Sequence, residues 1–93
     1  MAKFEIKPTG QFKKDLKRYK YDQGKLDDLQ KVLDCLEETG VVPKDYKPHP
    51  LFGNYKGFLE CHVQEDFLLI WIDKEKPLIK LVRIGSHSEL FKK

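Results

Sequence analysis

The stretch of sequence that decides the fold is Asp-Phe-Leu-Leu-Ile-Trp-Ile-Asp, residues 66–73. Its six inner residues are all apolar, so a strand built from them must be covered on both faces. Two further strand-like runs flank it, at residues 56–63 and 78–84, and short polar turns separate the three runs. We therefore expect a three-stranded antiparallel meander with residues 66–73 at its centre.

The first part of the chain predicts one strand and two helices. Residues 3–7 alternate polar and apolar side chains, which indicates a strand that ends at residues 8–10. Apolar residues then recur at helical spacing, first at Phe12, Leu16 and Tyr19 and then at Leu26, Leu29, Leu33 and Leu36. Residues 21–24 are expected to connect the helices, with Gly24 as a stop signal, and Gly40 to end the second helix.

Residues 41–55 are predicted to be irregular, because Pro43, Pro48 and Pro50 exclude a regular element there. The resulting order, β-α-α-β-β-β, is that of an α+β fold. Neither helix can bury its apolar stripe alone, so we expect a helix hairpin packed on a twisted, mostly antiparallel sheet. The first strand should join an edge of the meander, and residues 87–91 should form a last short helical turn.

The composition is that of a small, well-charged globular domain. The chain has 93 residues, 40% of them hydrophobic and 35% charged, so residues 1–93 are expected to form a single domain. No run resembles a membrane span or a signal peptide, which predicts a cytoplasmic protein without membrane contact. Cys35 and Cys61 sit inside apolar patterns and are expected to be reduced, buried thiols.

Positive charge is concentrated near the start of the chain. Residues 1–25 carry eight Lys or Arg against three acids. Four of these cations lie on the polar faces of the first predicted helix and form a candidate phosphate-contacting surface: Lys13, Lys14, Lys17 and Arg18. The alternative is an ordinary solvated helix surface.

The candidate site combines three histidines with two acids. His49 lies in the proline-rich segment, and His87 follows the last predicted strand. The alternation within residues 56–63 puts His62 on the face away from the core, two residues from Glu60. Asp66 follows the turn after His62. Side chains at loops and strand ends, held by a rigid sheet, are the usual way to build a site.

These residue types suit the cleavage of RNA without a metal ion. That reaction needs a base for the 2′-OH proton, cations for the charge that develops on phosphorus, and an acid for the leaving 5′ oxygen. Histidine serves both proton-transfer roles, since its ordinary pKa is ~6.5. Arg83 offers a permanently charged fork for phosphate. The spacings of the histidines, 13 and 25 residues, match no compact ligand motif, so neither a metal nor a cofactor is expected.

Each candidate also has a structural interpretation. A single histidine is commonly a hydrogen-bonded structural residue, and Asp66 is also a suitable turn residue. Arg83 suits a surface salt bridge, and Phe91 suits the core or a frayed end. Residue chemistry alone gives a basic, β-rich domain with an acid–base cluster and does not select RNA over other substrates.

Six blocks of sequence follow one another over nearly the whole chain in a specific order and spacing. They are residues 10–15 (GQFKKD), 46–51 (YKPHPL), 53–58 (GNYKGF), 60–63 (ECHV), 66–71 (DFLLIW) and 83–91 (RIGSHSELF). Together they resemble the YafQ branch of the RelE/ParE toxin superfamily. The resemblance implies two helices on an antiparallel sheet and ribosome-dependent endonucleolytic cleavage of mRNA.

The resemblance also implies a set of site residues. The catalytic positions of the family match four residues of this chain: His49, His62, Asp66 and His87. Phe91 matches a site aromatic, and Arg83 lies where the family commonly places a phosphate-binding base. Glu60 stands where relatives usually have Asp, so the carboxylate is kept on a longer arm.

Our hypothesis for the roles makes His49 or Asp66 the base and His87 the acid, with His62 and Arg83 binding the phosphate. The basic helix would contact ribosomal RNA. The resemblance implies a cognate antitoxin, the ribosome and mRNA as partners, and DNA contact only through the complex with the antitoxin.

Two rival functions follow from the same sequence. A ParE-like module that inhibits DNA gyrase without catalysis shares the fold but typically lacks the histidine cluster. A non-catalytic RNA-binding domain would need exposed stacking aromatics on the sheet, whereas most strand aromatics here are predicted to be core.

Overall fold

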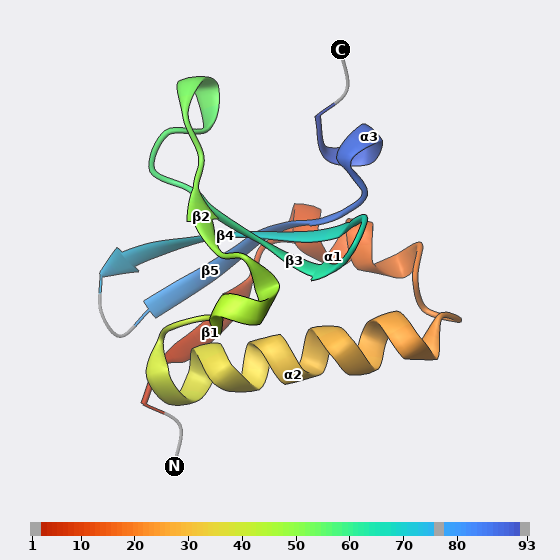
Figure 1. The fold of residues 1–93 in the computed structure, drawn as a ribbon, viewed down its shortest axis with the longest axis horizontal. Helices are drawn as coiled ribbons and strands as arrows, with labels where there is room; N and C mark the ends of the chain where they lie inside the picture. The colour runs from red at the N-terminus through yellow and green to blue at the C-terminus, as the bar shows by residue number, and fades with distance from the viewer. Residues whose placement is uncertain (1–2, 76–77, 92–93) are drawn as a thin grey trace.

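The computed structural model describes residues 3–75 and 78–91, and these form one helical layer on one sheet (Figure 1). In chain order the elements are β1 (Glu5–Pro8), α1 (Gly10–Lys17), α2 (Gln23–Thr39), the 3-10 turn η1 (Lys44–Tyr46), β2 (His49–Pro50), the 3-10 turn η2 (Gly53–Tyr55), β3 (Leu59–Gln64), β4 (Phe67–Glu75), β5 (Leu78–Gly85) and α3 (His87–Leu90). The predicted α+β fold is confirmed.

The strands form one sheet in the order β1-β5-β4-β3-β2. β4 pairs antiparallel with both β3 and β5, which confirms the predicted meander and its central strand. β1 joins the free edge of β5, in parallel. Both faces of β4 are buried, as its apolar run requires: Phe67, Leu69 and Trp71 lie in the large core, and Leu68 and Ile70 lie in a small cluster on the other face.

Helices α1 and α2 cover one face of the sheet, and the large core lies between the two layers (Figure 1). The predicted helical stripes supply this core through four buried side chains: Phe12, Leu29, Val32 and Leu36. Gly40 ends α2 as predicted, at a φ of 73°. Cys61 is buried and Cys35 is half-buried, and both are free thiols.

The connection between the helices spans residues 18–22, so it lies earlier in the chain than the predicted residues 21–24. Asp22 caps α2 by accepting a hydrogen bond from the Lys25 N–H at 3.2 Å, so the helix begins at Gln23. Gly24 therefore lies in the first helical turn and is not a stop signal. A side-chain cap satisfies a free N–H at the helix start, which outweighs the weak helix preference of one glycine.

The prediction that residues 41–55 hold no regular element is wrong at one point. His49 and Pro50 form the short strand β2, which pairs with Glu60 and Leu59 of β3. Proline is tolerated there because β2 is an edge strand that needs few backbone donors. β3 itself begins at Leu59 rather than at residue 56, because Gly57 turns the chain at a φ of 97°.

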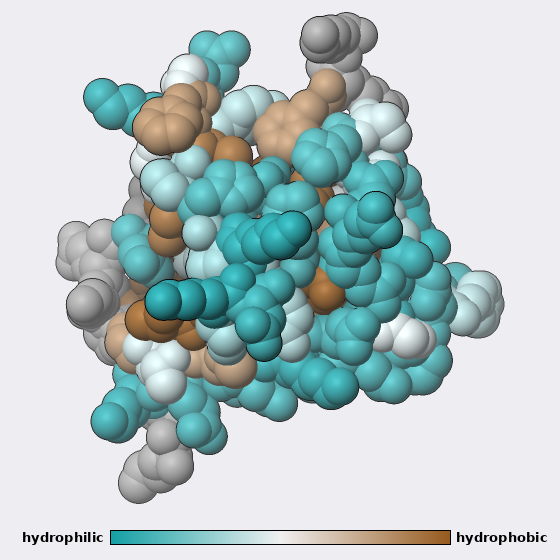
Figure 2. Space-filling model, in the orientation of Figure 1, coloured by the Kyte–Doolittle hydropathy of each residue, from teal (hydrophilic) through white to brown (hydrophobic). Residues whose placement is uncertain are grey.

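The second face of the sheet, which we call the open face, has no helix longer than α3 on it within residues 3–75 and 78–91. Residues 51–58 and α3 stand at its two sides (Figure 1). Its floor is the small apolar cluster of Leu68, Ile70 and Leu90. Figure 2 shows a mostly hydrophilic surface on the side seen in Figure 1, with only separate small apolar areas. In the described ranges no helix is both long and apolar enough for a membrane span.

Candidate active site

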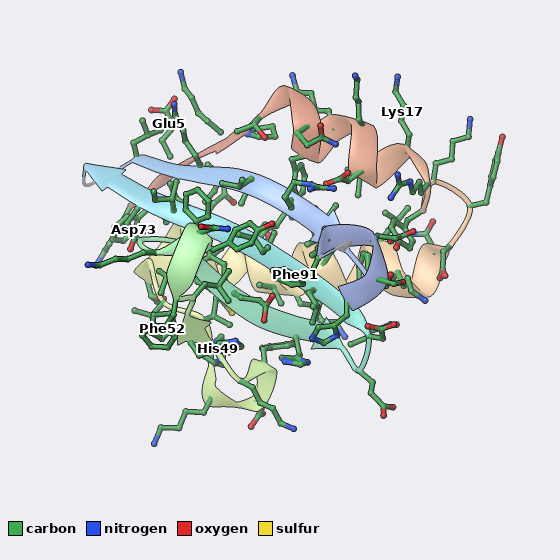
Figure 3. All side chains as sticks on the ribbon, turned by 90° about the horizontal axis from the view of Figure 1, so that it is seen from above. Glu5, Lys17, His49, Phe52, Asp73 and Phe91 are labelled. Carbon is green, nitrogen blue, oxygen red and sulfur yellow. The ribbon has the colours of Figure 1, made fainter. Side chains whose placement is uncertain are left out.

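His49, labelled in Figure 3, is the first of three histidines that lie in a row, with His62 in the middle and His87 last. The ring centroids of His49 and His62 lie 6.1 Å apart, and those of His62 and His87 lie 6.0 Å apart. His49 is placed by the pairing of β2 with β3, and His62 by the outward face of β3. His87 is placed by Ser86, whose side chain caps the start of α3. The structure thus brings together residues from three separate sequence blocks.

His87 is held by Asp66. One carboxylate oxygen, Asp66 Oδ1, accepts hydrogen bonds from the His87 backbone N–H at 3.0 Å and from ring atom Nδ1 at 3.1 Å. These two bonds, the backbone bond first, hold the pKa of Asp66 below its usual value. An ionised carboxylate can only accept, so Nδ1 carries the proton and Nε2 of His87 remains available to a substrate.

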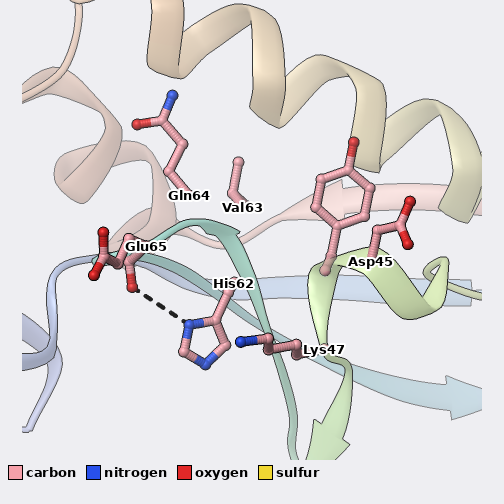
Figure 4. A pocket seen from close by; sticks show the side chains of 7 residues that line it. Asp45, Lys47, His62, Val63, Gln64 and Glu65 are labelled. Carbon is pink, nitrogen blue, oxygen red and sulfur yellow. Dashed lines mark hydrogen bonds between the residues drawn. The ribbon is translucent and has the colours of Figure 1, made fainter.

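His62, like His87, has a hydrogen-bond acceptor at Nδ1, in this case a backbone carbonyl. Its Nδ1 lies 3.4 Å from the carbonyl oxygen of Glu65, as the dashed line in Figure 4 marks. A carbonyl oxygen also can only accept, so this contact favours the proton on Nδ1 and leaves Nε2 free. His62 and His87 are therefore neighbouring rings, 6.0 Å apart between centroids, whose Nε2 atoms have no hydrogen-bond partner among the described residues.

His49 differs because both of its ring nitrogens have protein partners. Its Nδ1 donates to the Lys47 carbonyl at 2.9 Å, and its Nε2 lies 3.0 Å from Glu60 Oε1. The Glu60 side chain is only 5% exposed, and its Oε2 has no hydrogen-bond partner among the described residues. A buried carboxylate of this kind needs a partner, so the contact fixes the His49 ring and supports Glu60 at the same time.

Aromatic side chains form the wall of the site next to His87. The centroid of the Phe91 ring lies 6.1 Å from that of His87 and 5.3 Å from that of Tyr55, with the Tyr55 contact edge-to-face. Tyr55 also lies 6.3 Å from Phe58. The predicted position of Phe91 in the site is supported by this geometry. Tyr55 was not predicted as a site residue, because it lies in a segment without a periodic pattern.

Arg83 is bound to a buried acid. Its Nε donates to Asp15 Oδ2 at 2.7 Å and its Nη2 to Asp15 Oδ1 at 3.2 Å, and the Ile84 N–H donates to the same carboxylate at 3.2 Å. Burial raises the pKa of Asp15, but the hydrogen bonds from Arg83, Gln11 and Ile84 together bring it below its usual value. The guanidinium therefore joins α1 to β5, as in the salt-bridge alternative, through two of its five N–H donors, and phosphate binding by Arg83 stays a prediction.

The basic residues of the first helix lie apart from the histidine row. α1 packs on the core face of the sheet, and Figure 3 places Lys17 and His49 on opposite sides of the molecule. Lys13, Lys14 and Lys17 are exposed, as a phosphate-contacting surface would require. Arg18 is also exposed, and its Nη1 lies 3.5 Å from Glu89 Oε2.

A cluster that the sequence interpretation missed ties α3 to α1. Glu89 accepts hydrogen bonds from the Tyr19 hydroxyl and, at 2.9 Å, from the Ser86 N–H. These bonds, the one from Tyr19 first, lower the pKa of Glu89, and burial together with Glu89 raises the pKa of Tyr19 to about 12. The signal was present, because Ser86 and Glu89 have the spacing of a helix capping box.

No three His, Cys, Asp or Glu side chains among the described residues are close enough together to hold a metal ion. The arrangement instead offers two imidazoles with free Nε2 atoms, a third imidazole against a buried carboxylate, and an aromatic wall. Such a set can move protons at two neighbouring atoms of one substrate.

Comparisons with known proteins agree over the whole chain. A family described as "Bacterial toxin of type II toxin-antitoxin system, YafQ" matches residues 4–92. The mRNA interferase toxin YafQ of Escherichia coli strain K12 is 38% identical over 95 residues, which cover 98% of this chain and 99% of that protein.

Solved structures give the same result. One chain of the crystal structure of the E. coli DinJ-YafQ toxin-antitoxin complex matches with a TM-score of 0.81 at 31% identity, over 96% of this chain and 98% of that chain. A metal-bound toxin from Helicobacter pylori matches with a TM-score of 0.73 at 42% identity, over 98% of this chain and all of the other. The fold, the histidine row and these matches together show that the chain belongs to the YafQ family of bacterial type II toxin–antitoxin toxins.

Proposed function

We propose that this chain is a ribosome-dependent endoribonuclease that cleaves mRNA by acid–base catalysis without a metal ion. The observation that carries the proposal is the pair of free Nε2 atoms on His62 and His87, whose rings lie 6.0 Å apart. The E. coli relative, named an mRNA interferase toxin, supports RNA as the substrate class.

The reaction is an attack of the 2′ oxygen on the adjacent phosphorus. A base removes the 2′-OH proton, the bond from phosphorus to the 5′ oxygen breaks, and an acid protonates the departing 5′ oxygen. The products are a 2′,3′-cyclic phosphate and a free 5′-OH, so no water or metal enters the balance. Each well-placed acid or base contributes roughly 10²–10⁴-fold.

The contacts favour His87 as the acid and His62 as the base. Asp66 Oδ1 accepts from Nδ1 of His87 and fixes the ring, so a proton held on Nε2 would be presented to the leaving oxygen. The sequence-based hypothesis assigned the base to His49 or Asp66. In the structure His49 Nε2 faces Glu60, and the lowered pKa of Asp66 makes it a weak base. His62, first assigned to phosphate binding, keeps a free Nε2.

The partners follow from the same proposal. The toxin acts in the cytoplasm on translating ribosomes, and a cognate antitoxin binds it and covers the site. The E. coli DinJ-YafQ toxin-antitoxin complex supports an antitoxin as the partner. Contact with DNA belongs to the complex with the antitoxin. The exposed lysines of α1 bind ribosomal RNA phosphates.

An in-vitro translation reaction tests the function directly. Wild type should create new 5′ ends on translated mRNA, mapped by primer extension, and His87→Gln should create almost none while melting at the wild-type temperature. Intact mRNA with folded wild-type protein would refute the ribonuclease, and inhibition of DNA gyrase by the same sample would favour the ParE-like alternative.

A further inference from the structure

The proposed reaction needs positive charge at the scissile phosphate, and the predicted source does not supply it freely. Arg83 is engaged by the buried carboxylate of Asp15 through two hydrogen bonds. His49 lies against Glu60, so any positive charge on its ring is offset by that carboxylate. A cation without a carboxylate partner would therefore stabilise a phosphate beside His62 and His87 more than either of these groups.

Lys47 occupies an unusual backbone position next to this site. Its φ is 52°, and it is the one non-glycine residue with a positive φ in the described part of the chain. Its N–H donates to the Lys44 carbonyl at 2.9 Å, and its own carbonyl accepts from His49 Nδ1 at 2.9 Å. A left-handed lysine is strained, and such strain clusters at functional sites where the surroundings hold it.

The side chain of Lys47 faces a cavity shared with His62. This cavity has a volume of about 460 Å³ and lies between η1 and the end of β3, lined by Asp45, Tyr46, Lys47, His62, Val63, Gln64 and Glu65. In Figure 4 the Lys47 amine is directed toward the His62 ring, whereas Asp45 and Glu65 lie toward opposite ends of the cavity. Among the described residues Lys47 forms no ion pair, so its charge is available.

We propose that the Lys47 ammonium binds a non-bridging oxygen of the scissile phosphate in this cavity, beside Nε2 of His62. This role rests on the proposed ribonuclease function. As the 2′ oxygen adds to phosphorus, the phosphoryl group gains negative charge, so a fixed cation stabilises the transition state more than the bound substrate. Lys47 also fixes the His49 ring through its carbonyl, and that contact is independent of its side chain.

The test replaces the side chain and keeps the backbone. Lys47→Met should lower kcat for mRNA cleavage about 10²-fold, the effect of removing one charge-stabilising donor, with little change in KM. Lys47→Gly removes the amine and also relieves the strain at φ 52°, and it should lose as much activity as Lys47→Met. Lys47→Arg keeps the charge and should retain more activity than either variant.

The matched control is Lys44→Met, on the same turn but outside the cavity lining. It should cleave at the wild-type rate. Wild-type kcat in Lys47→Met would overturn the proposal. So would recovery in Lys47→Gly, because the loss would then come from the backbone and not from the missing amine.

A second measurement does not depend on cleavage. Inorganic phosphate is titrated into the protein while NMR records the ring signals of His62. Saturable shifts are expected in wild type and Lys44→Met and much weaker ones in Lys47→Met. Unmoved His62 signals in wild type, or equal shifts in Lys47→Met, would reject the Lys47 site. A wild type that binds phosphate but leaves translated mRNA intact would instead reject the ribonuclease function.

Discussion

At the histidines, the groups bonded to Nδ1 decide what each ring can do. The Lys47 and Glu65 carbonyls and the Asp66 carboxylate accept hydrogen bonds, so all three rings keep a proton on Nδ1. The rings differ at Nε2. In His49 this atom contacts Glu60, whereas in His62 and His87 it has no hydrogen-bond partner among the described residues. Residue type alone made the three equivalent, and only their contacts assign separate roles.

The charge of Asp66 can be tested by its pH dependence. A lowered folded-state pKa contributes stability that is present above the usual pKa of the group and is lost as pH falls through the folded value. Asp66→Asn should therefore unfold at a lower urea concentration than wild type near neutral pH. The two midpoints should converge in strong acid. If the two urea midpoints still differ in strong acid, the side-chain shape of Asp66, and not its charge, holds His87.

The Arg83–Asp15 pair is the second feature at the scale of residues. Arg83→Met leaves the Asp15 carboxylate buried without its partner and should lower the free energy of unfolding by about 3 kcal/mol. Chemical denaturation measures this loss of stability. The double variant Arg83→Met with Asp15→Leu should recover much of the lost free energy of unfolding. If Arg83→Met keeps wild-type stability but loses cleavage, Arg83 binds substrate after all.

At the scale of elements, two short pieces set the site, β2 and α3. Long elements were predictable because their patterns repeat, as the six apolar residues of β4 and the leucines of α2 illustrate. β2 was not, because two residues give no period and one of them is Pro50. Its pairing is what places His49 beside Glu60, so that contact was also beyond the sequence.

The two ends of α2 give a matched pair of glycine substitutions. Gly40→Ala should lower the free energy of unfolding by more than about 1 kcal/mol, because φ at this residue is 73° and an added Cβ would lie 2.6 Å from the Phe4 ring. Gly24→Ala should instead raise the melting temperature, because an added Cβ would lie 3.8 Å from Asp22 Oδ1, an ordinary contact distance, and alanine is the better helix former. Thermal melts that shift in the same direction would contradict this account of the two ends.

At the scale of the whole molecule, the histidine row and the exposed lysines of α1 lie on different faces. The sequence predicted this for His62, which it placed on the strand face away from the core, but it could not place His49 and His87 beside His62. It also gave no means of seeing that Arg83 turns toward Asp15, because that acid lies 68 residues away in α1. Pairings across such separations depend on the assembled sheet rather than on local pattern.

The separation of the two faces predicts separable functions. Replacing Lys13, Lys14 and Lys17 together by Gln should weaken association with ribosomes and flatten its salt dependence, by roughly one unit of slope per lost phosphate contact. The cleavage rate at saturating protein should stay near that of wild type. Lys31→Gln on α2 is the control. An unchanged salt dependence would make this face an ordinary solvated surface.

The parallel pairing of β1 with β5 joins Glu5 to Leu78 and bears on how the toxin is made. During synthesis the first strand and both long helices emerge well before the strand that completes their sheet. A growing copy that lacks β5 has no partner for β1, no Arg83 for Asp15 and no His87. Under the proposed function, half-made copies lack the proton donor of the reaction, and the same copies are the ones most open to proteases and self-association.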